Sequence, residues 1–205
     1  MSGIDDLLRP AKFDRIMNMP PLAEEIQEQH SWNPEDRSLN IYVKEEDKFT
    51  FHRHPVARST DAIRGKVGYS QGFHVWQIEW PEKQRGSHAM VGVATKTARL
   101  HEYGYTALIG TNTESYGWDI TRGECHHDSE NTKTWRYPFG NSPDAFHVPE
   151  KFYCILDMDE GYMAFATDEE YLGVAFGDLK GKTLYPIVAT VWGNCKISMR
   201  YLGSL

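Results

Sequence analysis

From residue 38 onward, the chain is a succession of short segments in which apolar and polar residues alternate, separated by turn-forming residues. Alternation with a period of two places every second side chain on the same face of a β-strand, so each segment predicts a strand with one buried face. The segments recur at a spacing of roughly 8–12 residues, with almost no helical period after residue 34. This pattern is typical of an antiparallel sandwich or barrel, and we predict a sandwich.

The clearest expected hairpin has Leu39, Ile41 and Val43 on its first strand, a turn at 45–47, and Phe49 and Phe51 on the second strand. In the next strand, 72–80, one face would carry Phe73, Val75, Gln77 and Glu79, and the other His74, Trp76, Ile78 and Trp80. Further strands are expected at 88–95, 105–110, 117–120, 152–157 and 163–167, with a closing pair within 184–201 and turns at Glu160-Gly161 and Gly181-Lys182.

The first thirty residues have a different pattern. Met17, Leu22 and Ile26 fall near helical spacing, and Pro20-Pro21 can open a helix that runs to Gln29. Trp32-Asn33-Pro34 should end it, because a residue before proline is displaced from the α region. We therefore expect residues 1–33 to form a helical extension that packs on a single domain spanning 34–205.

The longest apolar run, 184–193, predicts a buried strand that ends at Gly193. Composition alone places Trp192 in the core, because tryptophan is usually well buried.

Size, charge and cysteine content exclude several classes of protein. The 205 residues are enough for one domain with its own core, and the three cysteines show no Cys-x-x-Cys spacing, which favours a reducing, intracellular setting. We find no signal-peptide pattern and no stretch approaching the ~20 apolar residues of a membrane span. The net charge of -7, without a basic tract, argues against nucleic-acid binding. An RNA-associated protein with exposed Trp and Tyr stacking platforms stays open as a third alternative.

Three segments invite a catalytic or metal-binding interpretation, and each has a simpler one. Gly177 and Gly181 are separated by three residues where a phosphate-binding loop needs four, so a hairpin turn is expected. Asp157 and Asp159 could pair for acid-base chemistry, but the turn at 158–161 explains them. The run 125–128, Cys-His-His-Asp, contains metal-ligand types, but its neighbouring side chains point to opposite faces, so we expect a polar loop. We predict no catalytic residue, metal or cofactor; a sandwich-fold enzyme or a glycan- or metal-binding protein using Asp157, Asp159 and His126-His127 stays as the alternative.

Several longer motifs carry a family resemblance. They are His-Ser-Trp-Asn-Pro-Glu-Asp-Arg-Ser at 30–38, Phe-His-Arg-His-Pro-Val-Ala at 51–57, Ser-Thr-Asp at 59–61, Arg-Gly-Lys at 64–66, Gln-Arg-Gly at 84–86, Val-Gly-Val-Ala-Thr at 91–95, Gly-Trp-Asp at 117–119, Leu-Asp-Met-Asp-Glu-Gly at 156–161, and Leu-Tyr-Pro at 184–186 running to Trp192-Gly193. With these motifs in order, the chain resembles the SPRY domain-containing SOCS box proteins over most of its length.

The resemblance implies an all-β SPRY (B30.2) fold, a bent two-sheet antiparallel β-sandwich with short N-terminal helices. It also implies a non-enzymatic function in the ubiquitin conjugation pathway. The expected compartment is the cytoplasm, with the nucleus as a second one. Members of the family bind a short Asp/Glu-Ile/Leu-Asn-Asn-Asn motif in partners such as the RNA helicase Vasa, Par-4 or inducible nitric oxide synthase. Their SOCS box recruits elongins B and C and a cullin-5 ubiquitin ligase.

Matched motif by motif, the resemblance implies a peptide site on four loops, which comprises Arg53, Pro55, Ala57, Gly86, Ser87, Tyr105, Leu108, Val191, Trp192 and Gly193. Glycines leave backbone groups open to the amides of an Asn-rich peptide, and Tyr105 and Trp192 supply rigid walls. A guanidinium such as Arg53 or Arg85 would answer the acid at the head of the motif. On this interpretation, Trp192 lies at the surface.

The chain departs from the family pattern at a few positions. Ser87 stands where threonine is usual, Arg58 where glutamine is common, and Tyr116 where tryptophan is common. The chain ends at Leu205, where the SOCS box of the family would begin, and contains no Leu-x-x-x-Cys elongin-binding pattern. We therefore expect that only a longer form of the protein, with a SOCS box, recruits the ubiquitin ligase.

Overall fold

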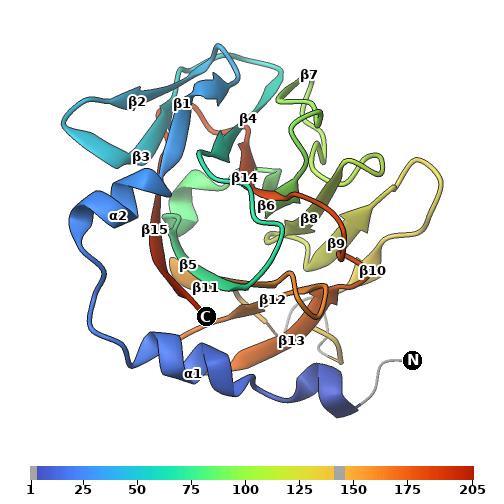
Figure 1. Cartoon of the computed structure of the whole chain (residues 1–205). Coiled ribbons are helices and arrows are strands. Elements are labelled where there is room, and N and C mark those ends of the chain that lie inside the picture. The colour runs from blue at the N-terminus through green and yellow to red at the C-terminus, as the bar shows by residue number, and fades with distance from the viewer. Residues whose placement is uncertain (1–3, 141–145) are drawn as a thin grey trace.

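The computed structural model describes residues 4–140 and 146–205 as two antiparallel sheets packed face to face (Figure 1). One sheet has the order β1(Trp32–Arg37), β4(Ser59–Gly65), β14(Tyr185–Thr190), β6(Ala89–Ala94), β8(Ser115–Asp119), β9(Glu124–His127) and β10(Trp135–Arg136), with β7(His101–Tyr103) also pairing with β4. The other has the order β13(Tyr171–Phe176), β12(Tyr162–Ala166), β11(Lys151–Asp157), β5(Phe73–Glu79), β15(Lys196–Ser204), β3(Asp47–Arg53) and β2(Ile41–Lys44). The predicted antiparallel sandwich is confirmed.

The main core lies between the two sheets and is rich in aromatic side chains, among them Trp32, Trp76, Trp80 and Trp118. Strand β5 shows how the alternation produces this core. Trp76 and Ile78 point inward to the other sheet, whereas Phe73 and Val75 point outward and pack against the helices. The two faces predicted for residues 72–80 are therefore confirmed. The inner face is buried in the main core, whereas the outer face is buried at Phe73 and Val75 and exposed at Glu79.

The N-terminal segment contains the 3-10 helix η1(Ile4–Leu7) and the helices α1(Ala11–Met17) and α2(Glu24–Gln29). Phe13 and Ile16 of α1 pack on the outer face of β5, β11 and β12. Figure 1 shows α1 below the sandwich. The helical prediction is correct in kind but wrong in its start, because residues 20–23 are not helical and the helix begins at Glu24. Neither Pro20 nor Pro21 has a backbone N–H to donate, and Pro21 displaces Pro20 from the α region. Residues 1–3 of the expected extension lie outside the described residues.

Most of the predicted strands are present, but residues 105–110 form a loop. Leu108 and Ile109 pack on the outer face of the first sheet with Met90 and Ile187, and the Thr106 N–H donates to the side chain of Thr60 at 3.0 Å. The apolar side chains of this segment are therefore buried by packing over the sheet, and the segment does not pair as a strand within it. The prediction of a polar loop at 125–128 is also wrong, since residues 124–127 form the strand β9.

Four stacked rings join the end of α2 to the second sheet. His30 lies 3.8 Å from the Tyr201 ring and His74 lies 4.1 Å from the Tyr69 ring, as distances between centroids. The Tyr69 hydroxyl and His30 Nδ1 form a hydrogen bond of 2.7 Å. Tyr201 donates its hydroxyl to His74 Nδ1 at 2.7 Å, because the other ring nitrogen of His74 donates to the Gln71 carbonyl. Burial lowers the pKa of both histidines, and their mutual repulsion lowers that of His30 further. Both rings are therefore held in the neutral form.

We expect the folded state to lose stability as the pH falls from 7.5 to 5.5. In the unfolded chain, His30 and His74 become protonated as the pH falls through about 6.5. In the folded chain, where their pKa values are lowered, they become protonated only at lower pH. Each histidine contributes at most about 1.4 kcal/mol per pH unit in this window. Urea unfolding at pH 7.5, 6.5 and 5.5 measures the effect. A variant with His30→Gln and His74→Gln should show a flatter slope, and the exposed His147→Gln should not; equal slopes in all three proteins would contradict the prediction.

Candidate functional site

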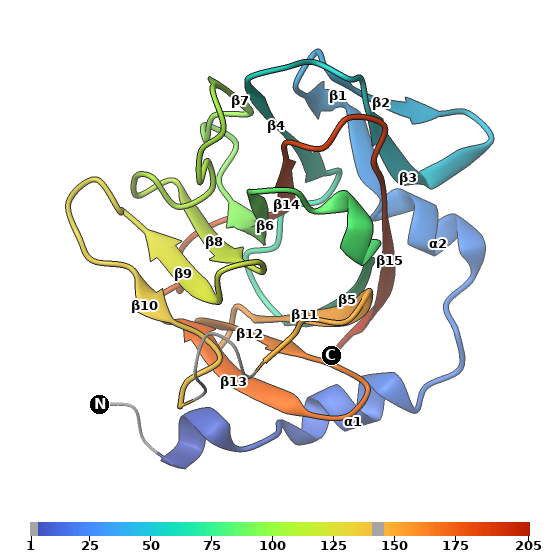
Figure 2. The ribbon, with the colours of Figure 1, turned by 180° about the vertical axis from the view of Figure 1, so that it is seen from behind.

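Four connections form the candidate site, and we refer to them as the four-loop surface. They are residues 54–58 between β3 and β4, 85–88 between η2(Glu82–Gln84) and β6, 104–110 after β7, and 191–195 between β14 and β15. Figure 2 shows the first and last of these side by side at the upper end of the sandwich. Each loop starts or ends at a strand or at a short helix, which fixes its ends.

Two glycines allow these loops to touch. A Cβ on Gly193 would lie 2.9 Å from the Cα of Pro55, so only glycine permits the last loop to pack against the first in this arrangement. Gly86 has a φ of +63°, and a Cβ there would lie 3.1 Å from the Trp192 ring and 3.3 Å from Val191. The structure thus brings together the predicted residues Pro55, Gly86, Val191, Trp192 and Gly193.

The third loop is tied to the first through Arg58. The Arg58 N–H donates to the Tyr105 hydroxyl at 3.0 Å, and the Gly104 N–H donates to the Arg58 carbonyl at 2.7 Å. Thr60 also donates its hydroxyl to the Gly104 carbonyl at 2.8 Å. Tyr105 is therefore held at its hydroxyl end, while 47% of the residue stays exposed.

Trp192 lies at the surface with 42% of its area exposed, so the core position that composition alone predicts for it is wrong. The strand ends at Thr190, whose hydroxyl accepts a hydrogen bond from the Trp192 N–H at 3.2 Å. Ile187 and Val188, earlier in the same strand, are buried as predicted. Two large aromatic side chains, Tyr105 and Trp192, are thus exposed on loops with fixed backbones.

Arg53 lies beneath this surface with 1% of its area exposed. Its guanidinium donates to an Asp61 carboxylate oxygen at 2.8 Å and to the carbonyls of Val56 and Ser59, each at 2.8 Å. These bonds hold the loop 54–58 from below. The expectation that the Arg53 guanidinium would answer a peptide's acid is wrong, because it is buried and already paired.

Asp61 is the centre of this buried network, and it accepts hydrogen bonds from the side chains of Ser38, Asn40, Arg53, Ser59 and His101. Burial raises the pKa of its carboxyl, but the hydrogen bonds from Ser38, His101, Arg53 and Asn40 outweigh burial and leave that pKa below its ordinary value. The carboxylate is therefore ionised at neutral pH and neutralises Arg53.

Arg85, the other guanidinium expected to answer the acid, is also buried. It donates to the carbonyls of Val148 at 2.6 Å, Pro149 at 2.8 Å and Trp80 at 2.9 Å. It joins the loop 85–88 to the segment before β11 and is not available to a ligand, so this expectation is wrong as well. Leu108 is also buried, in the cluster on the outer face of the first sheet.

The remaining predicted residues, Ala57 and Ser87, are exposed. The Ser87 hydroxyl is within 2.8 Å of His88 Nδ1, and its carbonyl accepts a hydrogen bond from Arg122 at 2.7 Å. Arg122 itself pairs with Asp119 at 3.0 Å. Sequence reasoning did not assign Arg58, Thr60 or Gly104 to the site. The one signal in the sequence that pointed to Arg58 was its departure from the glutamine that is common in the family. No sequence pattern revealed its left-handed backbone, which has a φ of +54°.

The acidic segments offer no metal centre in the described part of the chain, where no three His, Cys, Asp or Glu side chains converge on one point. The Asp157 carboxylate accepts the N–H groups of Asp159 and Glu160, and the Asp159 carboxylate accepts that of Gly72. Asp157 therefore stabilises the turn, as its sequence context predicts, and Asp159 connects the turn to Gly72.

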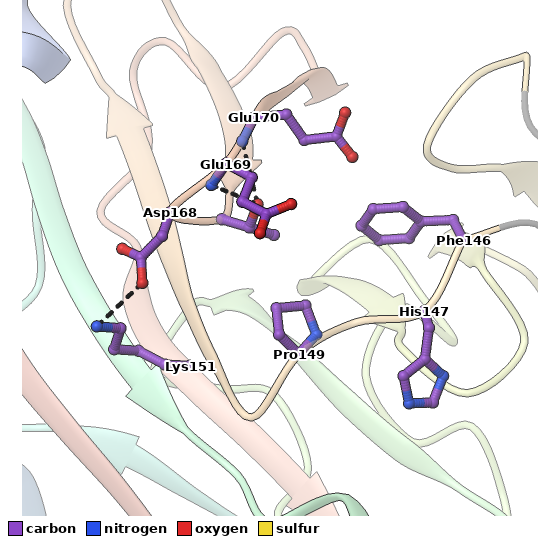
Figure 3. A pocket seen from close by; sticks show the side chains of 8 residues that line it. Phe146, His147, Pro149, Lys151, Asp168, Glu169 and Glu170 are labelled. Carbon is purple, nitrogen blue, oxygen red and sulfur yellow. Dashed lines mark hydrogen bonds and ion pairs between the residues drawn. The ribbon is translucent and has the colours of Figure 1, made fainter.

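A pocket of about 290 Å³ is lined by none of the residues of the four-loop surface, and Figure 3 shows its side chains. Asp168 on its wall is paired with Lys151 at 3.0 Å, and the N–H groups of Glu169 and Glu170 donate to the Thr167 hydroxyl. Its lining residues are Phe146, His147, Pro149, Lys151, Thr167, Asp168, Glu169 and Glu170. These contacts explain the acidic residues as parts of a turn and an ion pair.

Within residues 4–140 and 146–205, no helix has the length and apolar content needed to cross a membrane.

Comparison with known proteins agrees with this architecture. Residues 73–202 match the family model of the SPRY domain. Over 201 residues, the chain is 55% identical to Protein gustavus of Drosophila melanogaster and 56% identical to human SPRY domain-containing SOCS box protein 1. These matches cover 98% of this chain and 72% and 74% of the two relatives. The crystal structure of the SPRY domain of human HERC1 has a similar fold, with a TM-score of 0.62 at 17% identity, covering 83% of this chain and 97% of that one.

The sandwich and its connected loops therefore define a protein-interaction domain of the SPRY class. At this level of identity and coverage, the chain belongs to the family of SPRY domain-containing SOCS box proteins.

Proposed function

We propose that the four-loop surface binds a linear Asp/Glu-Ile/Leu-Asn-Asn-Asn motif in partner proteins, and that the chain is not an enzyme. The observation that carries the proposal is the pair of exposed aromatic residues, Tyr105 and Trp192, on loops that Gly86 and Gly193 allow to pack together. Exposed aromatic residues on a rigid support are typical of recognition hot spots.

The chemistry of the motif suits such a surface. Each asparagine amide both donates and accepts hydrogen bonds, and Gly86 and Gly193 have no side chain of their own to cover their N–H and C=O groups. The family resemblance suggests Vasa, Par-4 and inducible nitric oxide synthase as the kind of partner. In a form that carries a SOCS box, the chain would act in the cytoplasm as a substrate receptor for an elongin B/C and cullin-5 ubiquitin ligase.

Calorimetric titration with an Asp-Ile-Asn-Asn-Asn peptide tests the proposal. The control is the scrambled peptide Asn-Asp-Asn-Ile-Asn, which has the same composition and charge. We expect saturable binding at one site for the motif and a much weaker response for the scrambled peptide. Equal affinity for the two peptides would rule out the motif assignment.

A further inference from the structure

Arg58 occupies an unusual position at the junction of two loops of the site. Its backbone has a φ of +54°, a left-handed conformation that few non-glycine residues adopt. Hydrogen bonds on both sides, to the Tyr105 hydroxyl and from the Gly104 N–H, hold it there. The Arg58 side chain therefore leaves a fixed backbone position directly beside the aromatic residue Tyr105.

Of the four arginines in or against the four-loop surface, only Arg58 is uncommitted. Arg53 and Arg85 are buried and donate to Asp61 and to backbone carbonyls. Arg122 is paired with Asp119. Arg58 is exposed, and its guanidinium has no hydrogen-bond or ion-pair partner among the described residues. The surface thus presents one free guanidinium.

Lys196, at the end of the loop 191–195, faces a different direction. It is paired in register with His52 on β3, and its charge lowers the pKa of His52, after the larger effect of burial and that of Lys44. The neighbouring residues Phe51 and Ile197 point into the main core, so Lys196 and His52 project from the outer face of the sheet. Lys196 is therefore exposed near the site without belonging to it.

We propose that Arg58 binds the carboxylate at the head of the Asp/Glu-Ile/Leu-Asn-Asn-Asn motif and strengthens the preference of this protein for an acidic first residue. The inference rests on the proposed function and adds to it a residue that determines specificity. The motif has one ionisable side chain, and the surface has one free guanidinium, whose planar donors match a carboxylate. The expected gain is modest, because an exposed ion pair is screened by water and salt.

A cycle of two proteins and two peptides tests this inference, with calorimetry on the wild type and Arg58→Gln against Asp-Ile-Asn-Asn-Asn and Asn-Ile-Asn-Asn-Asn. We expect Arg58→Gln, which places the residue common in the family at this position, to reduce the wild-type preference for the Asp-headed peptide by about two- to fivefold, the size of an exposed ion pair. Lys196→Gln makes the same change in net charge and should keep the wild-type preference. Arg58→Glu should prefer Lys-Ile-Asn-Asn-Asn over the Asp-headed peptide.

The outcomes separate this inference from the proposed function. If Arg58→Gln still binds the motif and keeps the full wild-type preference for Asp, the assignment to Arg58 is overturned and the peptide site stands. If Lys196→Gln loses the preference as fully as Arg58→Gln, the effect comes from net charge and the assignment also fails. If the wild type does not distinguish the motif from its scrambled control, the proposed function fails and takes the inference with it.

Discussion

Replacing Trp192 with alanine is expected to weaken binding of the Asp-Ile-Asn-Asn-Asn peptide by about 2 kcal/mol or more, roughly 30-fold in Kd. The indole is half exposed and lies against Gly86, so its free face is available to a ligand while its position is fixed. Truncation removes this contact area and uncovers the packing between two loops. Calorimetry on the purified variant measures the loss.

Tyr105→Ala should cause a loss of similar size, because Tyr105 is the other exposed aromatic residue and its hydroxyl also accepts the Arg58 N–H. The matched control is Tyr103→Ala. Tyr103 is two residues away and 84% exposed, but it lies on β7, where it pairs with Ser59. We expect binding by this control to stay near that of the wild type. Near-wild-type affinity in both Trp192→Ala and Tyr105→Ala would show that the site lies elsewhere.

The largest loss of stability is expected from Asp61→Ala. Asp61 and Arg53 form an ion pair in which both side chains are essentially inaccessible to water, at 2.8 Å. Removing one partner leaves the Arg53 charge buried and unpaired, which costs about 3–5 kcal/mol in the free energy of unfolding. Urea denaturation of the variant measures this change.

The control is Asp14→Ala, which breaks the exposed pair with Arg9 and should cost no more than about 1 kcal/mol. A loss in Asp61→Ala no larger than in this control would mean that Arg53 finds other partners. The pH dependence has a defined sign. Because the pKa of Asp61 is lowered in the folded state, its contribution is complete above its unfolded pKa, near 3.9, and is lost as the pH falls through the folded pKa.

The same network connects stability to the site. The Arg53 guanidinium donates to Asp61 and also to the carbonyls of Val56 and Ser59, so the loss of Asp61 would release the side chain that holds this loop. Asp61→Ala should therefore bind peptide more weakly even at temperatures where the variant remains folded. Circular dichroism alongside calorimetry separates this local effect from global unfolding.

Local alternation made much of the fold predictable. In the strand 73–79, Trp76 and Ile78 face the main core while Phe73 and Val75 pack beneath α1, as the assignment of alternate residues to two faces predicts. Strand β4 was missed because all of its residues are buried, including Asp61 and Arg64, so that it carries no alternation. Its polar residues are tolerated through ion pairs with residues far away in the sequence, such as Arg64 with Asp36. A local pattern cannot contain that information.

The sequence by itself determined the antiparallel sandwich, because a period of two is a local property of each segment, and it determined the family, because the motifs occur in order. Only the tertiary structure decided which site residues face solvent. Arg53, Arg85 and Leu108 are buried, whereas Arg58, Tyr105 and Trp192 are exposed. The reason is physical, since the burial of a loop side chain depends on contacts between distant segments, such as Gly193 with Pro55 and Tyr105 with Arg58.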